Sequence, residues 1–250
     1  MKSKKYILAM CVTVAMCCFS HGATVGVIPG ALNDGIKYYW NFDSGSNTVI
    51  GSNWNGSFGY DSSTHTGTMG TISDRPWKDN LGMDLTSFTV SLDISNLTGN
   101  AWADIYCLET AKGKIKIEIN NTNEIYCYTP FGNVNLGSAF YTQLTGNNLS
   151  TFTFTGDDTS LKFYLDGVLI GSMEHGFLPT DDTSLTGMQF GQQYGGQHQL
   201  TSAIIDNVII WDRPLSQSEI LALTTIPEPS TATLGLLGLG ALMLRRRRAM

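Results

Sequence analysis

Short segments that alternate apolar and polar residues recur along most of this chain, and this pattern constrains the fold more than any other feature. Lys114–Ile119 (KIKIEI) alternates most cleanly. A period of two places successive side chains on opposite faces of a β-strand, so that one face is buried and the other is solvated. Turn-forming residues separate the segments, for example at Asn120–Asn123 and Asp166-Gly167. The predicted strands are Ile36–Phe42, Phe88–Ile94, Ala101–Leu108, Lys114–Ile119, Glu124–Tyr128, Leu149–Phe154, Lys162–Leu165, Val168–Ser172, Gly187–Gly191 and Ile204–Trp211.

Many short strands joined by polar turns predict an all-β protein with two packed antiparallel sheets, a β-sandwich or jelly roll. No amphipathic helix of ~12 residues is expected between the N-terminal segment and the last predicted strand. Gly51–Asp84 is less regular and is interpreted as long loops with one or two short strands. Charged residues make up 14% of the chain, and this low fraction, with frequent turn formers, is typical of a secreted all-β protein.

The stretch Ile204–Leu223 (IIDNVIIWDRPLSQSEILAL) closes the predicted domain. It begins as a β-branched and aromatic strand, and Asp212-Arg213-Pro214 ends that strand because proline has no amide donor. Ser216 then begins a short helix, since Ser216 and Glu219 have the spacing of a capping box.

This closing stretch resembles the final motif of the concanavalin A-like, laminin-G-like sandwich domains of bacterial secreted proteins. Leu161–Gly171 (LKFYLDGVLIG) resembles a hairpin of the same family, and Trp40-Asn41-Phe42-Asp43 resembles its start. The resemblance covers residues 36 to 223 and implies the jelly-roll fold, but it does not assign an activity because one fold supports many functions. The residues that match the final motif are Asp206, Val208, Trp211, Arg213, Leu215, Ser216, Glu219 and Ile220.

Residues 1–23 have the pattern of a signal peptide. Lys2, Lys4 and Lys5 form a basic start, Tyr6–Phe19 is apolar, and Ser20–Ala23 offers small residues for cleavage. A short membrane anchor is the alternative, although the apolar run is shorter than the ~20 residues that span a bilayer. The mature sandwich domain is therefore expected over residues 24–225.

Residues 226–250 combine Pro227-Glu228-Pro229, an apolar run from Ala232 to Leu244, and four arginines, Arg245–Arg248. The arginines are expected to stay on the cytoplasmic side of a membrane, and the apolar run is short for a permanent span of ~20 residues. We therefore expect transient membrane insertion, with an ordinary C-terminal anchor as the alternative.

The arrangement resembles the PEP-CTERM sorting signal of Gram-negative bacteria that make extracellular polysaccharide. The resemblance implies processing by exosortase, a membrane-embedded cysteine protease, followed by a location at the cell surface or outside the cell. It assigns recognition to Pro227, Glu228 and Pro229 and membrane retention to Arg245, Arg246, Arg247 and Arg248.

The acidic charge of the domain argues against nucleic acid as a partner. Residues 24–226 hold eight of the 15 basic residues but 20 of the 21 acidic residues. Such a domain repels a phosphate backbone.

The domain contains two cysteines, Cys107 and Cys127. They fall on predicted strands that are separated by a third, so they are expected ~9–10 Å apart, beyond the ~7 Å limit for a disulfide. Two buried free thiols are expected, with a disulfide as the alternative because the protein is secreted.

No pattern in the sequence predicts catalysis. A glycoside hydrolase needs two nearby carboxylates, and residues of one strand share a face only at even spacing. Glu109, Glu118, Glu124 and Glu174 lie singly near predicted strand ends and are interpreted as solvated surface acids. No nucleophile motif and no Cys/His zinc spacing is found, so we expect a protein that is not an enzyme, with a glycoside hydrolase or lyase as the weakest alternative.

Binding is the expected function. Tyr194, Gln197 and His198 combine an aromatic ring with polar side chains in one loop, and Trp54 and Trp77, together with Trp102, are candidate aromatic platforms. We expect non-catalytic glycan binding or adhesion to extracellular polysaccharide in the matrix or envelope. The alternative is a structural or protein-binding envelope protein without a glycan site.

One structural calcium ion is a further hypothesis, because calcium binds carboxylate and carbonyl oxygens in loops. The paired acids Asp157, Asp158, Asp181 and Asp182 are the weak candidate ligands.

Overall fold

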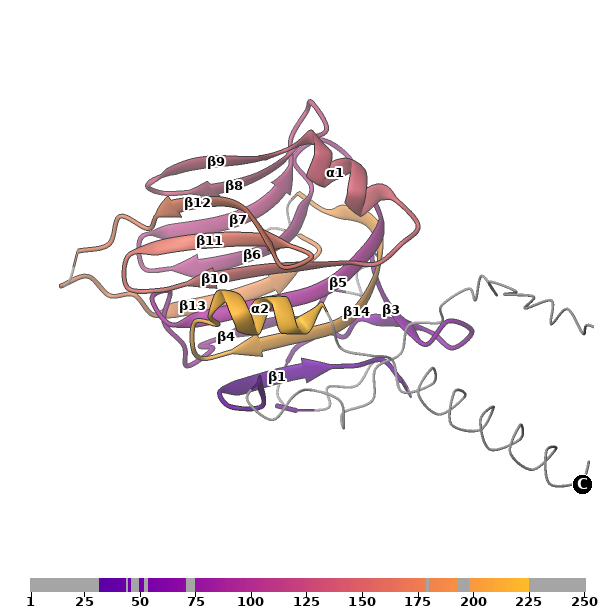
Figure 1. Ribbon diagram of the computed structural model, residues 1–250, viewed down its shortest axis with the longest axis horizontal. Helices are drawn as coiled ribbons and strands as arrows, with labels where there is room; N and C mark the ends of the chain where they lie inside the picture. Colours follow the sequence, from indigo (N-terminus) through magenta and orange to yellow (C-terminus); the bar gives the residue numbers. More distant parts are fainter. Residues whose placement is uncertain are drawn as a thin grey trace, which may run out of the picture.

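A computed structural model describes residues 32–43, 45, 50–51, 54–70, 75–178, 180–192 and 198–224. Two antiparallel sheets pack face to face in these residues (Figure 1), which confirms the predicted sandwich. The predicted signal peptide and the sorting signal lie outside the described residues. Within the described part of the chain, no helix is long and apolar enough to cross a membrane.

The larger sheet has the order β12-β11-β10-β5-β14-β3-β2, and β1 also pairs with β14. β1 and β3 share one edge of β14, where β1 pairs near Val208–Trp211 and β3 pairs with Ala203–Ile205. The strands of this sheet are β1 (Ile36–Trp40), β2 (Gly59–Asp61), β3 (Thr66–Met69), β5 (Phe88–Gly99), β10 (Ser150–Gly156), β11 (Ser160–Leu165), β12 (Val168–Glu174) and β14 (Leu200–Trp211).

The smaller sheet has the order β4-β13-β6-β7-β8-β9. Four of its strands follow one another in the chain as a meander from β6 to β9. The strands are β4 (Trp77–Asp79), β13 (Leu185–Phe190), β6 (Asp104–Thr110), β7 (Gly113–Ile119), β8 (Ile125–Thr129) and β9 (Gly132–Gly137).

The main hydrophobic core lies between the two sheets. Ile115, Ile117 and Ile119 of β7 are buried there, whereas Lys114 and Lys116 alternate with them on the other face. From the larger sheet, the rings of Phe154 and Phe163 stack with their centroids 4.8 Å apart. The period-two alternation in the sequence therefore identifies the core face, as predicted.

A second apolar cluster lies on the outer face of the larger sheet, beneath α2 (Gln217–Leu223). In Figure 1, α2 lies across β10, β5 and β14. Trp211 is buried in this cluster, and its Nε1 donates a hydrogen bond to the carbonyl oxygen of Leu32 at 2.8 Å. The closing helix therefore covers an apolar surface that the sandwich alone would expose.

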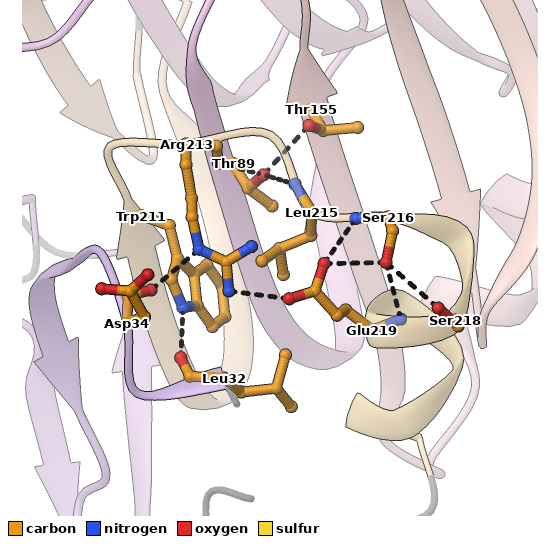
Figure 2. A network of polar contacts seen from close by, with 10 residues as sticks. All are labelled: Leu32, Asp34, Thr89, Thr155, Trp211, Arg213, Leu215, Ser216, Ser218 and Glu219. Carbon is orange, nitrogen blue, oxygen red and sulfur yellow. Dashed lines mark hydrogen bonds and ion pairs between the residues drawn. The ribbon is translucent and has the colours of Figure 1, made fainter. Parts of the chain in front are cut away.

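The predicted capping box is present at the start of α2 (Figure 2). The Ser216 hydroxyl accepts a hydrogen bond from the amide of Glu219, and the Glu219 carboxylate accepts one from the amide of Ser216 at 2.8 Å. Arg213 lies 2.8 Å from the Glu219 carboxylate and donates through Nε to the carbonyl oxygen of Asp34. One acid therefore caps the helix and ties it to the end of β14.

The structure differs from the prediction at three places. The short helix α1 (Ser138–Thr145) follows β9, and it buries only Phe140 and Leu144, too few residues to give a helical pattern in the sequence. Strand β9 was not predicted because its sequence, GNVNLG, holds two apolar residues. The stretch Gly51–Asp84 contains three short strands, β2, β3 and β4, instead of one or two.

Cys107 and Cys127 are both free and buried, as expected from their strands. They lie on β6 and β8, with β7 between them. The predicted turn at Asp166-Gly167 is also present, with φ angles of 47° and 77° between β11 and β12. Glycine favours such positive φ values in a two-residue hairpin.

Candidate functional site

The register of the smaller sheet aligns two rows of side chains across its outer face. Directly paired residues of neighbouring strands project from the same face of a sheet. Because Lys116 and Glu118 alternate with buried isoleucines of β7, their cross-strand partners also face away from the core. The first row contains Trp77, Gln189, Cys107, Lys116, Tyr128 and Asn133, and the second contains Asp104, Glu118, Tyr126 and Asn135.

An aromatic group, defined here as Trp102, Tyr126 and Tyr128, lies on this face. Trp102 is 41% exposed, and its ring centroid is 6.2 Å from that of Tyr128. The rings of Tyr126 and Tyr128 stack 5.4 Å apart. Lys116 places its Nζ 5.2 Å from the centroid of the Tyr128 ring, within the range of a cation–π contact.

Trp102 is held in an unusual backbone conformation in the turn between β5 and β6. Its φ is 71°, in the left-handed region that non-glycine residues seldom adopt. Its amide donates a hydrogen bond to the carbonyl oxygen of Ile119 at the end of β7. A positive φ at a large, exposed aromatic residue is typical of positions where the surrounding structure fixes a functional side chain.

Polar side chains border the aromatic group at β8 and β9. Asn135 Nδ2 donates hydrogen bonds to the Tyr126 hydroxyl at 2.9 Å and to the Glu124 carboxylate at 3.1 Å. Glu124 also accepts hydrogen bonds from Thr122 and Asn120, and the bonds from Thr122, Asn135 and Asn120 lower the pKa of its carboxyl. The Tyr126 hydroxyl and the Asn135 amide are therefore fixed in orientation at the surface.

Two buried carboxyls, Asp104 and Glu118, lie beside the aromatic group. Their exposed fractions are 0% and 1%, so the prediction that Glu118 is a solvated surface acid was wrong. That prediction rested on carboxylate pairs along one strand, whereas Asp104 of β6 and Glu118 of β7 are paired across two strands. Burial, followed by the neighbouring Glu118, raises the pKa of Asp104 well above its usual range.

Lys116 and His198 are the basic groups nearest to this pair. Lys116 Nζ lies 2.7 Å from Glu118 Oε2, and His198 Nδ1 lies 3.8 Å from the same oxygen. Both carboxyls are inaccessible to a bulky substrate, whereas a glycoside hydrolase must place a glycosidic bond between its two acids. The pair is therefore a poor match for hydrolase chemistry.

The residues predicted to bind a ligand have different locations. His198 lies at the buried acids, whereas Tyr194 and Gln197 lie outside the described residues. Trp54 packs on the core, with ring centroids 5.4 Å from Tyr38 and 5.2 Å from Trp40. Trp77 is half-buried on β4, at the far end of the first row.

Four residues of this face, Lys116, Tyr126, Tyr128 and Asp104, were not among the predicted site residues. A usable signal was present in two successive strands, because Lys116 and Glu118 of β7 and Tyr126 and Tyr128 of β8 all occupy outward positions of the alternation. Reading those positions side by side requires the strand register, which a single sequence does not supply.

Three of the four aspartates considered for calcium, Asp157, Asp181 and Asp182, have partners within the protein. Asp157 accepts hydrogen bonds from the amides of Thr159 and Ser160 and pairs with Lys162. Asp181 lies 2.9 Å from Lys112 Nζ, and Asp182 accepts a hydrogen bond from the amide of Ser184.

Comparison with known proteins agrees with the fold. Residues 72–221 match the family model described as the concanavalin A-like lectin/glucanases superfamily, in its laminin-G form, and the chain belongs to this superfamily. Residues 225–248 match the PEP-CTERM protein-sorting motif. This motif marks exported proteins that a membrane protease, exosortase, processes before they reach the surface or the exterior. No curated protein matches the chain.

Solved structures with the same fold include binding domains of botulinum neurotoxins. The domain of neurotoxin DC, in complex with rat synaptotagmin II, is 15% identical with a TM-score of 0.57, covering 77% of this chain and 52% of that one. A structure of neurotoxin type C, which depends on interaction with two ganglioside molecules for entering cells, is 14% identical with a TM-score of 0.55, covering 78% and 52%. The chain thus spans about half the length of these proteins, and identities this low show the fold alone.

Proposed function

We propose that this exported protein binds a glycan, without cleaving it, on the outer face of its smaller sheet. The observation that carries the proposal is the exposed indole of Trp102 beside the ring of Tyr128. An aromatic ring offers a flat apolar surface to the C–H face of a sugar, while nearby polar groups hydrogen-bond the sugar hydroxyls. The Lys116 ammonium and the Tyr126 hydroxyl, which accepts a hydrogen bond from Asn135 and keeps its own proton to donate, are such groups here.

The accessible part of this face lies around Trp102, Lys116, Tyr126 and Tyr128. Gln189 and Cys107, which separate Trp77 from Lys116 in the first row, are 5% and 0% exposed. Trp77 is therefore not part of one continuous binding surface with the aromatic group. The acidic charge of the domain favours a neutral or basic polysaccharide over a strongly anionic one.

The sorting motif supports a location where such a ligand occurs. Processing at Pro227–Pro229 would release the domain from the membrane into the envelope or matrix of a Gram-negative bacterium. Neurotoxin type C has the same fold and depends on gangliosides for entering cells. This fold therefore occurs in at least one protein whose function depends on a glycan.

Affinity electrophoresis in gels that contain the polysaccharide of the producing strain, or a panel of soluble polysaccharides, tests the proposal. Trp102→Ala and Tyr128→Ala should each weaken retention about tenfold, because each removes one stacking surface. Trp102→Phe is the matched control, because it keeps an aromatic ring at the same backbone position and should retain most of the binding. Equal retention of the wild type and Trp102→Ala would contradict the proposal.

Protein binding at the opposite sheet is the second candidate function. Val168, Leu169 and Leu221 are at least half exposed on β12 and α2. Leu169 also lines a groove of about 480 Å³, together with Tyr164 and Gln217 among others. Leu169→Glu should abolish a protein contact there and leave glycan retention unchanged, and cross-linking on cells of the producing strain would measure the difference.

A further inference from the structure

Asp104, Glu118 and His198 come from three distant segments and converge on one point. Each side chain offers one atom that can bind a metal ion, and these three atoms all lie within 4.8 Å of one another. The main chain fixes the arrangement, because Asp104 and Glu118 are direct cross-strand partners and the amide of Asp104 donates a hydrogen bond to the carbonyl oxygen of His198 at 2.9 Å.

Asp104 is the observation that points to a missing partner. It is completely buried, and no amide, amine, imidazole or hydroxyl group of the described residues donates a hydrogen bond to either of its oxygens. A buried carboxyl without a donor is costly, and a second carboxyl beside it increases that cost. The pair needs a shared proton or a cation.

The charges around the site can accommodate a cation. The ammonium of Lys116 neutralises one carboxylate of the pair through Glu118 Oε2, so the second carboxylate needs its own proton or a bound cation. Glu118 Oε1 is not part of this ion pair. The His198 side chain is 35% exposed, so it is the solvent-facing member of the three.

The types of ligand, two carboxylates and one imidazole, indicate the class of metal. Calcium prefers six to eight oxygen ligands, whereas imidazole suits zinc and other late transition metals. Two ligand atoms that each lie ~2.1 Å from one ion are at most ~4.2 Å from each other. The three ligand atoms here lie within 4.8 Å of one another. Side-chain shifts of less than ~1 Å would therefore let all three bind one ion.

We propose that Asp104, Glu118 and His198 bind one divalent transition-metal ion, zinc fitting best, which joins β6, β7 and the segment before β14. Three protein ligands leave at least one position of the ion for water. The ion would stabilise the turn that carries Trp102, two residues before Asp104. The proposal is independent of the glycan proposal, because its tests need no glycan.

The test uses the full chain, stripped of metal with a chelator and returned to zinc. Equilibrium dialysis should give one zinc equivalent that is lost in His198→Ala and retained in His65→Ala, a matched substitution of an exposed histidine elsewhere. At a hundredfold excess of zinc over Kd, the melting temperature of the wild type should rise by ~5 °C or more. Calcium at the same concentration should give no comparable rise.

Asp104→Asn keeps the protein testable if other variants fold poorly, because the amide is isosteric with the carboxyl. It should abolish the zinc-dependent rise in melting temperature and, without zinc, melt no lower than the wild type, because it removes the repulsion from Glu118. A wild type without a zinc-dependent rise, or one whose zinc equivalent persists in His198→Ala, would overturn the proposal and leave a shared proton as the partner of the two acids.

Discussion

Asp104 and Glu118 are direct cross-strand partners on β6 and β7, and both carboxyls are buried on the outer face of the sheet instead of in its core. Lys116 supplies an ammonium group 2.7 Å from the Glu118 carboxylate. The same lysine lies over the ring of Tyr128, so this one side chain connects the buried acids to the aromatic group at the surface.

Lys116→Met is expected to destabilise the protein by ~2–3 kcal/mol, because it leaves the buried Glu118 carboxylate without its ammonium partner. The matched control is Lys162→Met, since Lys162 and Asp157 form an ion pair in which both side chains are about one-third exposed. That substitution should cost less than ~1 kcal/mol. Urea denaturation measures both free energies of unfolding, and equal losses would show that burial of Glu118 is not important.

Stability should fall in acid as the contacts of Glu219 are lost. Its hydrogen bond with Arg213 is the main cause that lowers the pKa of Glu219 from 4.5 to about 2. An acid with a lowered folded-state pKa stabilises the protein above its unfolded pKa, and this contribution is lost as the pH falls from about 4.5 to about 2. The side chain is partly solvated, so the contribution is ~1 kcal/mol.

Glu219→Gln is the control for this pH dependence, because it keeps the size of the side chain but cannot titrate. Denaturation midpoints between pH 5 and pH 2.5 should fall less steeply in Glu219→Gln than in the wild type. Parallel curves for the two proteins would assign the acid sensitivity to other carboxyls.

Phe154→Ala is expected to lower the free energy of unfolding by ~3–5 kcal/mol, as large-to-small substitutions of buried phenylalanines do. The ring is fully buried between Phe88, at 5.0 Å, and Phe163. Leu169→Ala, at a half-exposed site on β12, should change stability by no more than ~0.5 kcal/mol. Guanidinium denaturation measures the free energy of unfolding of both variants. A small loss of stability in Phe154→Ala would argue against the proposed packing of the sheets.

The thiols of Cys107 and Cys127 should not react with a thiol reagent in the folded protein. Both are buried, and burial raises the pKa of each thiol, which suppresses the reactive thiolate. Both should react after unfolding without a reductant. If the unfolded chain required reductant before these two cysteines reacted, a disulfide would be present.

The sequence predicted the parts of the fold that depend on local patterns. Lys114–Ile119 has its core-facing isoleucines where the alternation places them. Ser216 and Glu219 form the capping box that their spacing indicates. Both patterns act over a few neighbouring residues, so a single sequence contains enough information to identify them.

The candidate site was harder to predict because it depends on register. Asp104 and Glu118 are 14 positions apart in the sequence, and only the pairing of β6 with β7 makes them neighbours. Trp102 and Tyr128 meet through a turn and a strand that are also distant in the chain. The sequence named Trp102 as a candidate platform but could not show which of the tryptophans packs inward, as Trp54 does.

The most direct test of the glycan proposal is oxidative footprinting of the protein with and without a polysaccharide that retains it in affinity gels. The oxidation of Trp102, Tyr126 and Tyr128 should fall when the polysaccharide is present, while that of Leu169 on β12 and Leu221 on α2 should not change. Protection at Leu169 and Leu221, with none at Trp102, would contradict a binding site on the outer face of the smaller sheet.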